Sequence, residues 1–406
     1  LLPLSAFQIS PFSFNLRLFN SQLYSMKLLV TGAKGFIGRN LCLALRRTEK
    51  VEVLEIGSDH TESDLTQAVA IADAVVHLAG VNRPEKEEEF IEGNVDFTQK
   101  LCDLLAATGR KVPVVCSSST QAERDNAYGT SKRGGEQVLL DYQEETGSPV
   151  YVFRLPNVFG KWSRPDYNTV VATFCHNISR GLPVTVNDSD VELTFAYVDD
   201  VVSQFVACAT GKVESGNQKV ETGVLKFDPA YKISLGELHD LIVSFKESRK
   251  TLKLADFGDP LTKYLYTTYL SFLDRDDFSY PVDLKTDDRG WLFELIKSDT
   301  AGQMFVSSTK PGITRGNHYH DTKVEKFCVV KGQGVIRFRH VFEDKAFEYP
   351  VDDKNIKIVD IPPGYTHSIE NTGDSEMVTL FWANEIFDPE RMDTFFENVE
   401  IGKAES

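Results

Sequence analysis

The feature that most constrains the fold is a glycine-rich turn near the start of the chain. The apolar run KLLVT, 27–31, leads directly into TGAKGFIG, 31–38, and a helical pattern follows. Glycines with this spacing permit a tight turn, a close approach of the backbone to a pyrophosphate, and close helix packing. The free amides at the start of the helix would then bind the phosphates. The cofactor-binding residues predicted here are Thr31, Gly32, Gly35, Phe36, Ile37, Gly38 and Arg39.

The rest of the chain shows two patterns. From residue 26 to about 255, short apolar runs alternate with helical patterns, which predicts a parallel sheet covered on both faces. We expect an α/β, Rossmann-type, doubly wound fold for this part. From about residue 287 to the end, period-two strands and turns predict an all-β domain, in the form of a small barrel. Residues 256–286 are interpreted as a linker with one aromatic helix near 261–273.

The first 25 residues differ in composition from the rest. They contain no acidic side chain, one arginine and five serines, and they begin with leucine. Transit peptides are poor in acids and rich in serine but usually carry more arginine. We therefore interpret 1–25 as a non-native or targeting-like extension without a catalytic role, and expect the protein proper to begin at Met26.

Charge and cysteine content argue against several functions. The formal net charge of −16 disfavours nucleic acid and anionic membranes as partners, because neutralising phosphates requires clustered lysine and arginine. Six cysteines lie far apart without a CxxC motif. This pattern is typical of reduced thiols and predicts a cytoplasmic protein. No run approaches the ~18 uncharged apolar residues of a membrane helix.

A tyrosine and a lysine follow a serine-rich strand end. The run SSST, 117–120, precedes YGTSK, in which Tyr128 and Lys132 are four residues apart. At this spacing they share one face of a helix. The phenol has an ordinary pKa near ~10, and a neighbouring ammonium favours its phenolate. Tyr128 is therefore a candidate general acid for the alkoxide formed when hydride reaches a ketone, with a serine hydroxyl holding the substrate oxygen.

Three histidines and a glutamate predict a metal site in the β-domain. His318 and His320 are two residues apart in PGITRGNHYHDTKVEKF, 311–327, so on a strand their side chains face the same way. Glu325 follows a short turn, and His367 stands far downstream in PPGYTHSIEN. Three imidazoles and a carboxylate can surround one divalent ion. This donor set leaves Zn, Fe, Mn and Ni open, and zinc is our first expectation.

The motifs of the α/β part resemble one family. TGAKGFIG, HLAG, SSS, YGTSK, RLPNVFG and YVDD occur in the order typical of the extended short-chain dehydrogenase/reductase family, which acts largely on nucleotide-activated sugars. The resemblance implies that Tyr128 is the proton donor and Lys132 its partner. It places the assisting hydroxyl at Ser119, with Ser118 as the alternative. It further implies cofactor contacts from Leu78, Ala79 and Gly80, and substrate contacts from Ser118, Arg154 and Asn157.

The β-domain resembles the cupins. Its spacing matches both cupin motifs, apart from Ile356, which stands where a glycine is expected: Gly312-x5-His318-x-His320-x4-Glu325-x6-Gly332 and Pro362-x-Gly364-x2-His367-x3-Asn371. The stretch DDRGWLFEL, 287–295, is similar to the opening of cupin-type epimerases that act on nucleotide 4-keto sugars. A general base is not assigned, and Tyr319, Lys323 and His340 are the possibilities.

A reductase of this kind, followed by the link KYLYTTYLSFL and a cupin, resembles the bifunctional enzymes of capsular polysaccharide synthesis. The resemblance implies a UDP-2-acetamido-2,6-dideoxy-4-keto-hexose as the substrate. The cupin would epimerise C3. The reductase would then reduce C4 and yield UDP-N-acetyl-6-deoxy-talosamine, on the route to UDP-N-acetyl-L-fucosamine. A metal at the histidine cluster would polarise the ketone oxygen and so ease removal of the adjacent proton.

The cofactor and the role of the cupin have alternatives. Asp59 has the distance from the glycine turn of an acid that holds a ribose 2′-hydroxyl, whereas Arg39 could meet a 2′-phosphate. These residues leave NADH and NADPH open, and NADPH is our expectation. One rival function is a single reductase activity with a structural, metal-stapled cupin that dimerises. Another is a non-catalytic dinucleotide sensor, which the presence of both Tyr128 and Lys132 disfavours. Family analogy predicts a homodimer formed through the cupin.

Overall fold

The structure, a computed structural model, describes residues 25–48, 50–167, 169–211 and 221–400. The chain forms two compact units. Unit 1 comprises the residues up to Leu155 together with Asp199–Phe227, and unit 2 comprises Pro156–Val198 and the residues from Asp228 onwards. The region expected to be the reductase domain, 26–255, therefore contributes to both units. The predicted extension, 1–25, lies outside the described residues except for its last residue.

Unit 1 is built on a six-stranded parallel sheet, which confirms the predicted Rossmann-type fold. The strand order β2-β1-β3-β4-β5-β8 reverses between β1 and β3. In open α/β sheets, ligands bind beyond the carboxyl ends of the strands at such a point. The strands are β1 Met26–Thr31, β2 Val51–Ile56, β3 Ala74–His77, β4 Val114–Ser119, β5 Val150–Leu155 and β8 Gly223–Lys226.

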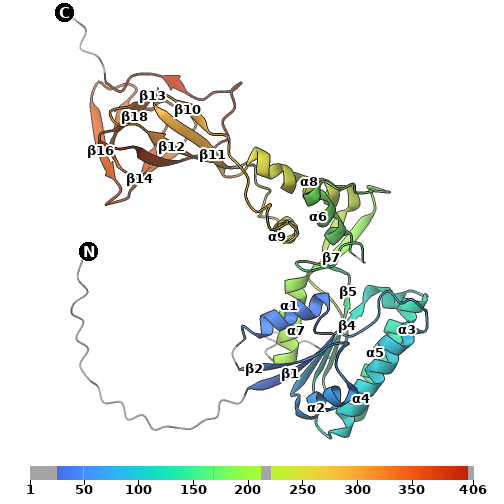
Figure 1. Cartoon of the computed structure of the whole chain (residues 1–406). Helices are drawn as coiled ribbons and strands as arrows, with labels where there is room; N and C mark the ends of the chain where they lie inside the picture. The colour runs from blue at the N-terminus through green and yellow to red at the C-terminus, as the bar shows by residue number, and fades with distance from the viewer. Residues whose placement is uncertain (1–24, 49, 168, 212–220, 401–406) are drawn as a thin grey trace, which may run out of the picture. The chain divides into compact units, whose positions relative to one another are not determined.

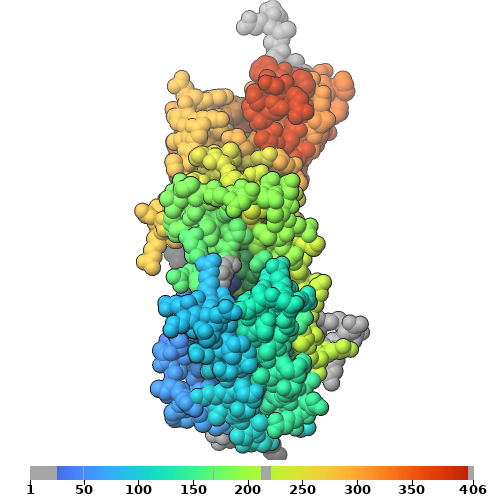
Figure 2. All heavy atoms as spheres, turned by 90° about the vertical axis from the view of Figure 1, so that its right-hand side faces the viewer, coloured from blue at the N-terminus to red at the C-terminus, as the bar shows by residue number. Residues whose placement is uncertain are grey.

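Helices cover both faces of this sheet, with α1 and α7 on one face and α2, α4 and α5 on the other (Figure 1). Figure 2 looks onto the second face, where residues in the light blue to teal part of the colour range, including α4 and α5, form the surface. The helical elements are α1 Phe36–Leu45, α2 Glu62–Ile71, α3 Glu89–Ile91, a π-helix Glu92–Asp96, α4 Phe97–Ala107, a 3-10 helix Thr120–Glu123, α5 Ala127–Thr146 and α7 Val198–Thr210. Leu29 and Val75 from the sheet and Leu101 and Leu139 from the helices form the fully buried core beneath that face.

The first part of unit 2 is a small α/β layer. Its sheet has the order β6-β7-β9, with strands Asn157–Phe159, Glu192–Tyr197 and Tyr231–Ser234. Its helices are α6 Val170–Arg180, α8 Leu235–Thr251 and α9 Pro260–Leu270. The aromatic helix expected near 261–273 is α9, which ends three residues earlier. Asp259 caps its start by accepting a hydrogen bond from the Thr262 amide at 2.8 Å, and Tyr264 stacks on Tyr197 with ring centroids 4.0 Å apart.

The rest of unit 2 is antiparallel throughout, which confirms the predicted all-β domain. Two sheets, of order β10-β11-β12-β19-β14-β17 and β16-β15-β18-β13-β20, enclose a core that includes Phe327, Ile336, Ile369 and Phe381. The strands are β10 Lys285–Asp287, β11 Gly290–Ser298, β12 Gly302–Thr309, β13 Thr314–Tyr319, β14 Glu325–Lys331, β15 Gln333–His340, β16 Ala346–Asp352, β17 Ile358–Ile361, β18 Tyr365–Asn371, β19 Met377–Ala383 and β20 Phe395–Phe396.

Two negative findings concern the described residues. No helix among them has the length and apolar character needed to cross a membrane. All six cysteines lie in the described part of the chain and none is paired in a disulfide; five of them are buried.

Candidate active sites

The glycine turn forms a backbone cradle at the carboxyl end of β1. Gly32 has a φ of +68°, and a Cβ there would lie 2.7 Å from the Ala79 amide nitrogen. A Cβ at Gly38 would lie 2.3 Å from the Gly32 carbonyl oxygen. The Leu78 amide donates to the Thr31 carbonyl at 3.1 Å, so the segment after β3 packs against the turn. Only glycine fits these positions, and the absence of a side chain there lets the backbone come close to a pyrophosphate.

An acid beyond β2 is paired with a base from the glycine turn. Asp59 lies 2.5 Å from the Lys34 ammonium, and the hydrogen bond from Lys34 holds the pKa of the Asp59 carboxyl below its ordinary value. Arg39 is exposed on α1. Sequence reasoning weighed Asp59 and Arg39 but missed Lys34, although a cation inside the glycine turn was a usable signal. The site therefore holds a partner for a ribose hydroxyl and one for a 2′-phosphate.

The structure brings Tyr128, Lys132 and Ser119 together where the carboxyl end of β4 meets the first turns of α5. Asn126 caps α5 by accepting from the Gly129 amide at 2.8 Å, which places Tyr128 in the first turn. The Lys132 ammonium donates to the Ser117 carbonyl at 3.0 Å. The Tyr128 hydroxyl donates to the Asn82 side-chain oxygen at 3.2 Å. All of these contacts lie within unit 1.

Burial dominates the electrostatics of this pair. It raises the pKa of Tyr128, and the Ser119 hydroxyl offsets part of that rise. Burial also lowers the pKa of the Lys132 ammonium, while Glu136 acts in the opposite direction. The direction for Tyr128 differs from that expected of a neighbouring ammonium alone, because the phenol is itself withdrawn from water. A phenol with a raised pKa keeps its proton at neutral pH and can donate it.

A buried ion pair lies one helical turn beyond Lys132. Arg154 donates to Glu136 from Nη2 at 2.6 Å and from Nε at 3.0 Å, and Ser118 donates to the same carboxylate at 2.5 Å. Glu136 is only 5 % exposed. Sequence reasoning missed Glu136, although its i+4 spacing from Lys132 was visible. The Ser118 hydroxyl is thus directed towards Glu136, whereas the Ser119 hydroxyl is the one that influences the pKa of Tyr128.

The predicted substrate contacts are distributed over both units. Ser118 and Arg154 are bound to Glu136 in unit 1, and their contact with substrate stays a prediction. Asn157 belongs to unit 2, where its side chain donates to the Thr194 carbonyl at 3.4 Å. Among the predicted cofactor contacts, Gly80 lies against Asn94, since a Cβ on Gly80 would be 2.7 Å from the Asn94 side-chain oxygen.

The four predicted metal ligands converge in the β-domain. One ligand atom from each of His318, His320, Glu325 and His367 lies within 4.8 Å of the others. His318 pairs directly opposite His367 across β13 and β18, and His320 follows the end of β13. Glu325 begins β14, and its Oε2 lies 3.2 Å from His320 Nε2 and 3.4 Å from His367 Nε2. The four side chains therefore face a common point.

The chemistry of this cluster fits a divalent metal. His367 is fully buried, and within the described residues its Nε2 atom makes no hydrogen bond of acceptable geometry. Burial lowers the pKa of His318 to about 4, so its imidazole is neutral. Burial raises the pKa of Glu325, but the adjacent His320 and His367 imidazoles and the Lys323 ammonium outweigh this effect and hold the pKa below its ordinary value. Neutral imidazoles and an ionised carboxylate are the forms that ligate Zn, Mn, Fe or Ni.

Of the three candidates for an acid–base role in the cupin, the structure places Lys323 at the cluster. Its ammonium lies 3.6 Å from Glu325 Oε1. Tyr319 instead stacks on Phe395 with centroids 5.2 Å apart, and His340 packs edge-on against Tyr365.

Comparison with known proteins covers nearly the whole chain. The family described as "NAD dependent epimerase/dehydratase family" matches residues 28–221, and the "Polysaccharide biosynthesis C-terminal domain" matches residues 285–395. The UDP-2-acetamido-2,6-beta-L-arabino-hexul-4-ose reductase of Pseudomonas aeruginosa is 46 % identical over 91 % of this chain and 98 % of its own. The crystal structure of the capsular polysaccharide assembling protein CapF from Staphylococcus aureus is 48 % identical, with a TM-score of 0.85. The match covers 92 % of this chain and all of that one. The chain belongs to the CapF family.

A further CapF structure, solved with the inhibitor 3-isopropenyl-tropolone, matches with 43 % identity and a TM-score of 0.80 over 92 % of this chain and all of that one. The CapF fold accounts for both halves of the molecule, a Rossmann-type sheet followed by antiparallel β-sheets. The resemblance drawn from the motifs is thereby confirmed at the level of family.

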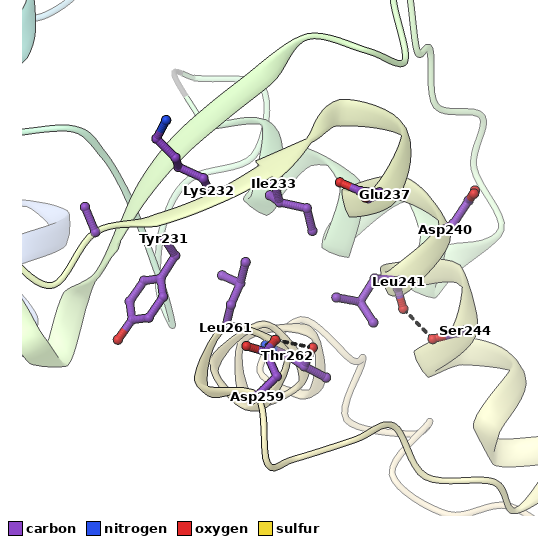
Figure 3. A pocket seen from close by; sticks show the side chains of 11 residues that line it. Tyr231, Lys232, Ile233, Glu237, Asp240, Leu241, Ser244, Asp259, Leu261 and Thr262 are labelled. Atoms are coloured by element: carbon purple, nitrogen blue, oxygen red, sulfur yellow. Dashed lines mark hydrogen bonds between the residues drawn. The ribbon is translucent and has the colours of Figure 1, made fainter. Parts of the chain in front are cut away.

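This CapF family member also has an open hollow of about 830 Å³ beside α8 and α9 of unit 2. Ile233, Leu241 and Leu261 converge on it from three elements (Figure 3). Its rim carries three carboxylates and one ammonium, contributed by Glu237, Asp240, Asp259 and Lys232. The Lys232 ammonium is 2.7 Å from Glu192. This excess of negative charge disfavours a pyrophosphate, so the hollow is a poor site for the UDP moiety.

Proposed function

We propose that this chain is a two-site enzyme of capsular or surface polysaccharide precursor synthesis, acting on a UDP-2-acetamido-2,6-dideoxy-4-keto-hexose. Unit 1 provides the reducing site and the cupin provides an epimerising site. The observation that carries the proposal is the grouping of Tyr128, Lys132 and Ser119 close to a dinucleotide cradle, in a chain nearly half identical to a named UDP-hexulose reductase.

The reduction at C4 uses the chemistry of the Tyr128 phenol. A bound nicotinamide would supply the hydride. As the carbonyl carbon receives the hydride, Tyr128 transfers its proton to the developing alkoxide, and the ketone becomes a hydroxyl. The Ser119 hydroxyl donates a hydrogen bond to the same oxygen. Lys132 stabilises the phenolate left on Tyr128, because its ammonium is held on the same helix face by Ser117.

We propose NADPH as the reductant. Lys34 reaches the end of β2 and can meet a 2′-phosphate there, and the position of its ammonium next to Asp59 supports this choice. A phosphate would compete with Asp59 for Lys34. NADH would instead use the Asp59 carboxylate for its ribose hydroxyl.

The cupin is proposed to invert C3 before the reduction. The C3 proton lies next to the C4 ketone and becomes acidic when the enolate is stabilised. His318, His320, Glu325 and His367 would hold the divalent ion, with zinc as the first candidate, and the ion would supply Lewis acidity at the ketone oxygen. Reduction at C4 afterwards removes the carbonyl and fixes the new configuration. The product is UDP-N-acetyl-6-deoxy-talosamine, on the route to UDP-N-acetyl-L-fucosamine.

The test uses the UDP-4-keto-6-deoxy sugar in deuterated water with wild type and Tyr128→Phe. We expect the variant to stop oxidising NADPH while deuterium still enters C3. Wild type that oxidises NADPH without any deuterium at C3 would overturn the epimerase assignment and leave a single reductase activity.

One observation favours a second role for the cupin. Its edge strand β16 exposes Phe347 and Tyr349, which are 43 % and 49 % exposed, and Ile358 on β17 is 67 % exposed. Exposed aromatic side chains on an edge strand are a place where a second copy can pair. We propose a homodimer through the cupin on this basis. Light scattering at micromolar concentration tests it, and a monomer mass there contradicts it.

A further inference from the structure

A segment near the end of the chain runs back along the strand that carries the first metal ligand. We call residues 388–399 the strap. Its short strand β20 pairs antiparallel with β13, with Phe396 opposite His318. The amide of Glu397 donates to the Asn317 carbonyl at 2.9 Å, and the Val399 amide donates to the Asn317 side chain at 3.2 Å. The strap is therefore part of the sheet that holds the cluster.

The carboxylate of Asp393 binds the loop between two ligands. It accepts hydrogen bonds from the backbone amides of Asp321, Thr322 and Lys323 at 2.8, 2.7 and 2.7 Å, and from the Thr322 hydroxyl at 2.8 Å. These residues connect His320 to Glu325. Four hydrogen bonds from one loop to one carboxylate fix the backbone path, and thereby the separation of the two ligands.

The backbone of Asp393 also orients His320. The carbonyl oxygen of Asp393 lies 2.5 Å from His320 Nδ1. A carbonyl can only accept, so Nδ1 carries the hydrogen and Nε2 keeps its lone pair. That Nε2 faces Glu325 Oε2 at 3.2 Å, on the side of the cluster. One residue of the strap thus sets the tautomer of one ligand and the path of the chain to the next.

The far end of the strap is fastened by a buried cation. Arg339 is 4 % exposed and donates to the carbonyls of Asn398 and Val399 at 2.9 and 3.1 Å, and it also pairs with the Glu397 carboxylate. The hydroxyl of Thr366 donates to the Glu397 carbonyl at 2.5 Å. Thr366 is adjacent to the ligand His367, so the strap is tied to both strands that supply histidines.

We propose that Asp393 is a positioning residue of the metal centre, and that the strap is a required part of it. Docking of the strap sets the ligand geometry before the ion arrives. Hydrogen-bonding partners of this kind typically change metal affinity by about 10–100-fold when removed. The inference rests on the metal site proposed above, and its experiment is arranged so that the two can fail separately.

The experiment titrates Zn²⁺ into metal-stripped full-length protein against a chromophoric chelator and records the visible spectrum of the Co²⁺ form. Asp393→Ala should bind Zn²⁺ about 10–100-fold more weakly than wild type. Its Co²⁺ bands should also shift, because the loop that connects His320 to Glu325 loses the four hydrogen bonds that fix its path. Asp393→Asn keeps the size of the side chain but loses acceptor capacity. Its affinity for Zn²⁺ should lie between those of wild type and Asp393→Ala. Unfolding midpoints measured in chelator show whether each variant is folded before metal is added.

Asp388→Ala is the matched control. Asp388 is a partly exposed acid of the strap that accepts from the Glu390 amide and pairs with Arg391. The Asp388→Ala variant should bind Zn²⁺ and Co²⁺ as wild type does. Asp393 variants with wild-type affinity and wild-type Co²⁺ bands overturn the positioning role while leaving the metal site in place. A wild type that binds no metal overturns both proposals.

Discussion

The hydroxyl of Ser118 donates a 2.5 Å hydrogen bond to the carboxylate of Glu136, which lies one helical turn beyond Lys132. Arg154 donates to the same carboxylate from Nη2 at 2.6 Å. The end of β4, the helix α5 and the strand β5 are therefore joined at a single acid. Ser119, whose hydroxyl offsets part of the rise in the pKa of Tyr128, is the next residue on β4.

The substitution Glu136→Gln should destabilise the fold by about 2–3 kcal/mol. Breaking a buried pair leaves an uncompensated charge, and the partial exposure of Arg154 moderates that cost. Urea unfolding of the two proteins at pH 7 measures the difference. The control is Glu123→Gln, because Glu123 is an exposed partner of the same Arg154 and should cost less than about 1 kcal/mol. Equal losses in both variants would show that the Ser118–Glu136–Arg154 junction has no special role.

Stability should fall in mild acid because of His77. This imidazole is buried between the Thr31 hydroxyl at 2.7 Å and the Thr98 hydroxyl at 3.0 Å, and burial lowers its pKa to about 3. The unfolded chain takes up the proton near pH 6.5 and the folded chain does not. Stability is therefore fully present above about pH 6.5 and is lost below it, by about 1.4 kcal/mol per pH unit down to about pH 3.

The measurement for His77 compares wild type with His77→Gln by urea unfolding between pH 7 and pH 4.5, in the presence of chelator. The variant should show a shallower decline with acid, since all other groups are shared. Parallel declines in the two proteins would mean that His77 titrates alike in the folded and unfolded states.

The choice of reductant should depend on Lys34. Lys34→Ala is expected to raise the KM for NADPH about tenfold, equivalent to about 1.4 kcal/mol of binding, and to leave the KM for NADH nearly unchanged. The comparison variant is Arg39→Ala, which removes the other cation of the turn and should leave both constants unchanged. If Arg39→Ala rather than Lys34→Ala weakens the binding of NADPH, the 2′-phosphate contacts α1 instead.

The parts of this account that were predictable from sequence depend on short spacings. The strand–glycine turn–helix at 26–45 and the Tyr128–Lys132 pair each lie within one local element, so their geometry follows from helix and strand periodicity. The two histidines before β14 are also local. Placing His367 with them required the known spacing of the two cupin motifs, because β13 and β18 are far apart in the chain.

The parts that were not predictable depend on tertiary proximity and burial. Asp393 stands more than 60 residues after the loop it binds, in a segment with no recognisable motif. Lys34 and Asp59 meet only because β1 and β2 are neighbours in the sheet. The raised pKa of Tyr128 follows from burial, which the sequence pattern does not reveal.

The most direct test of the central claim, that two separate sites act in turn, is the reduction of two substrates by His367→Ala. The UDP-4-keto sugar is supplied either with C3 already inverted or with C3 not inverted, and NADPH oxidation is followed. The account predicts that the variant reduces the inverted ketone at the wild-type rate and loses activity on the other. If His367→Ala reduces the ketone that is not inverted at the wild-type rate, the account is contradicted, because the cupin would then have no part in the reaction.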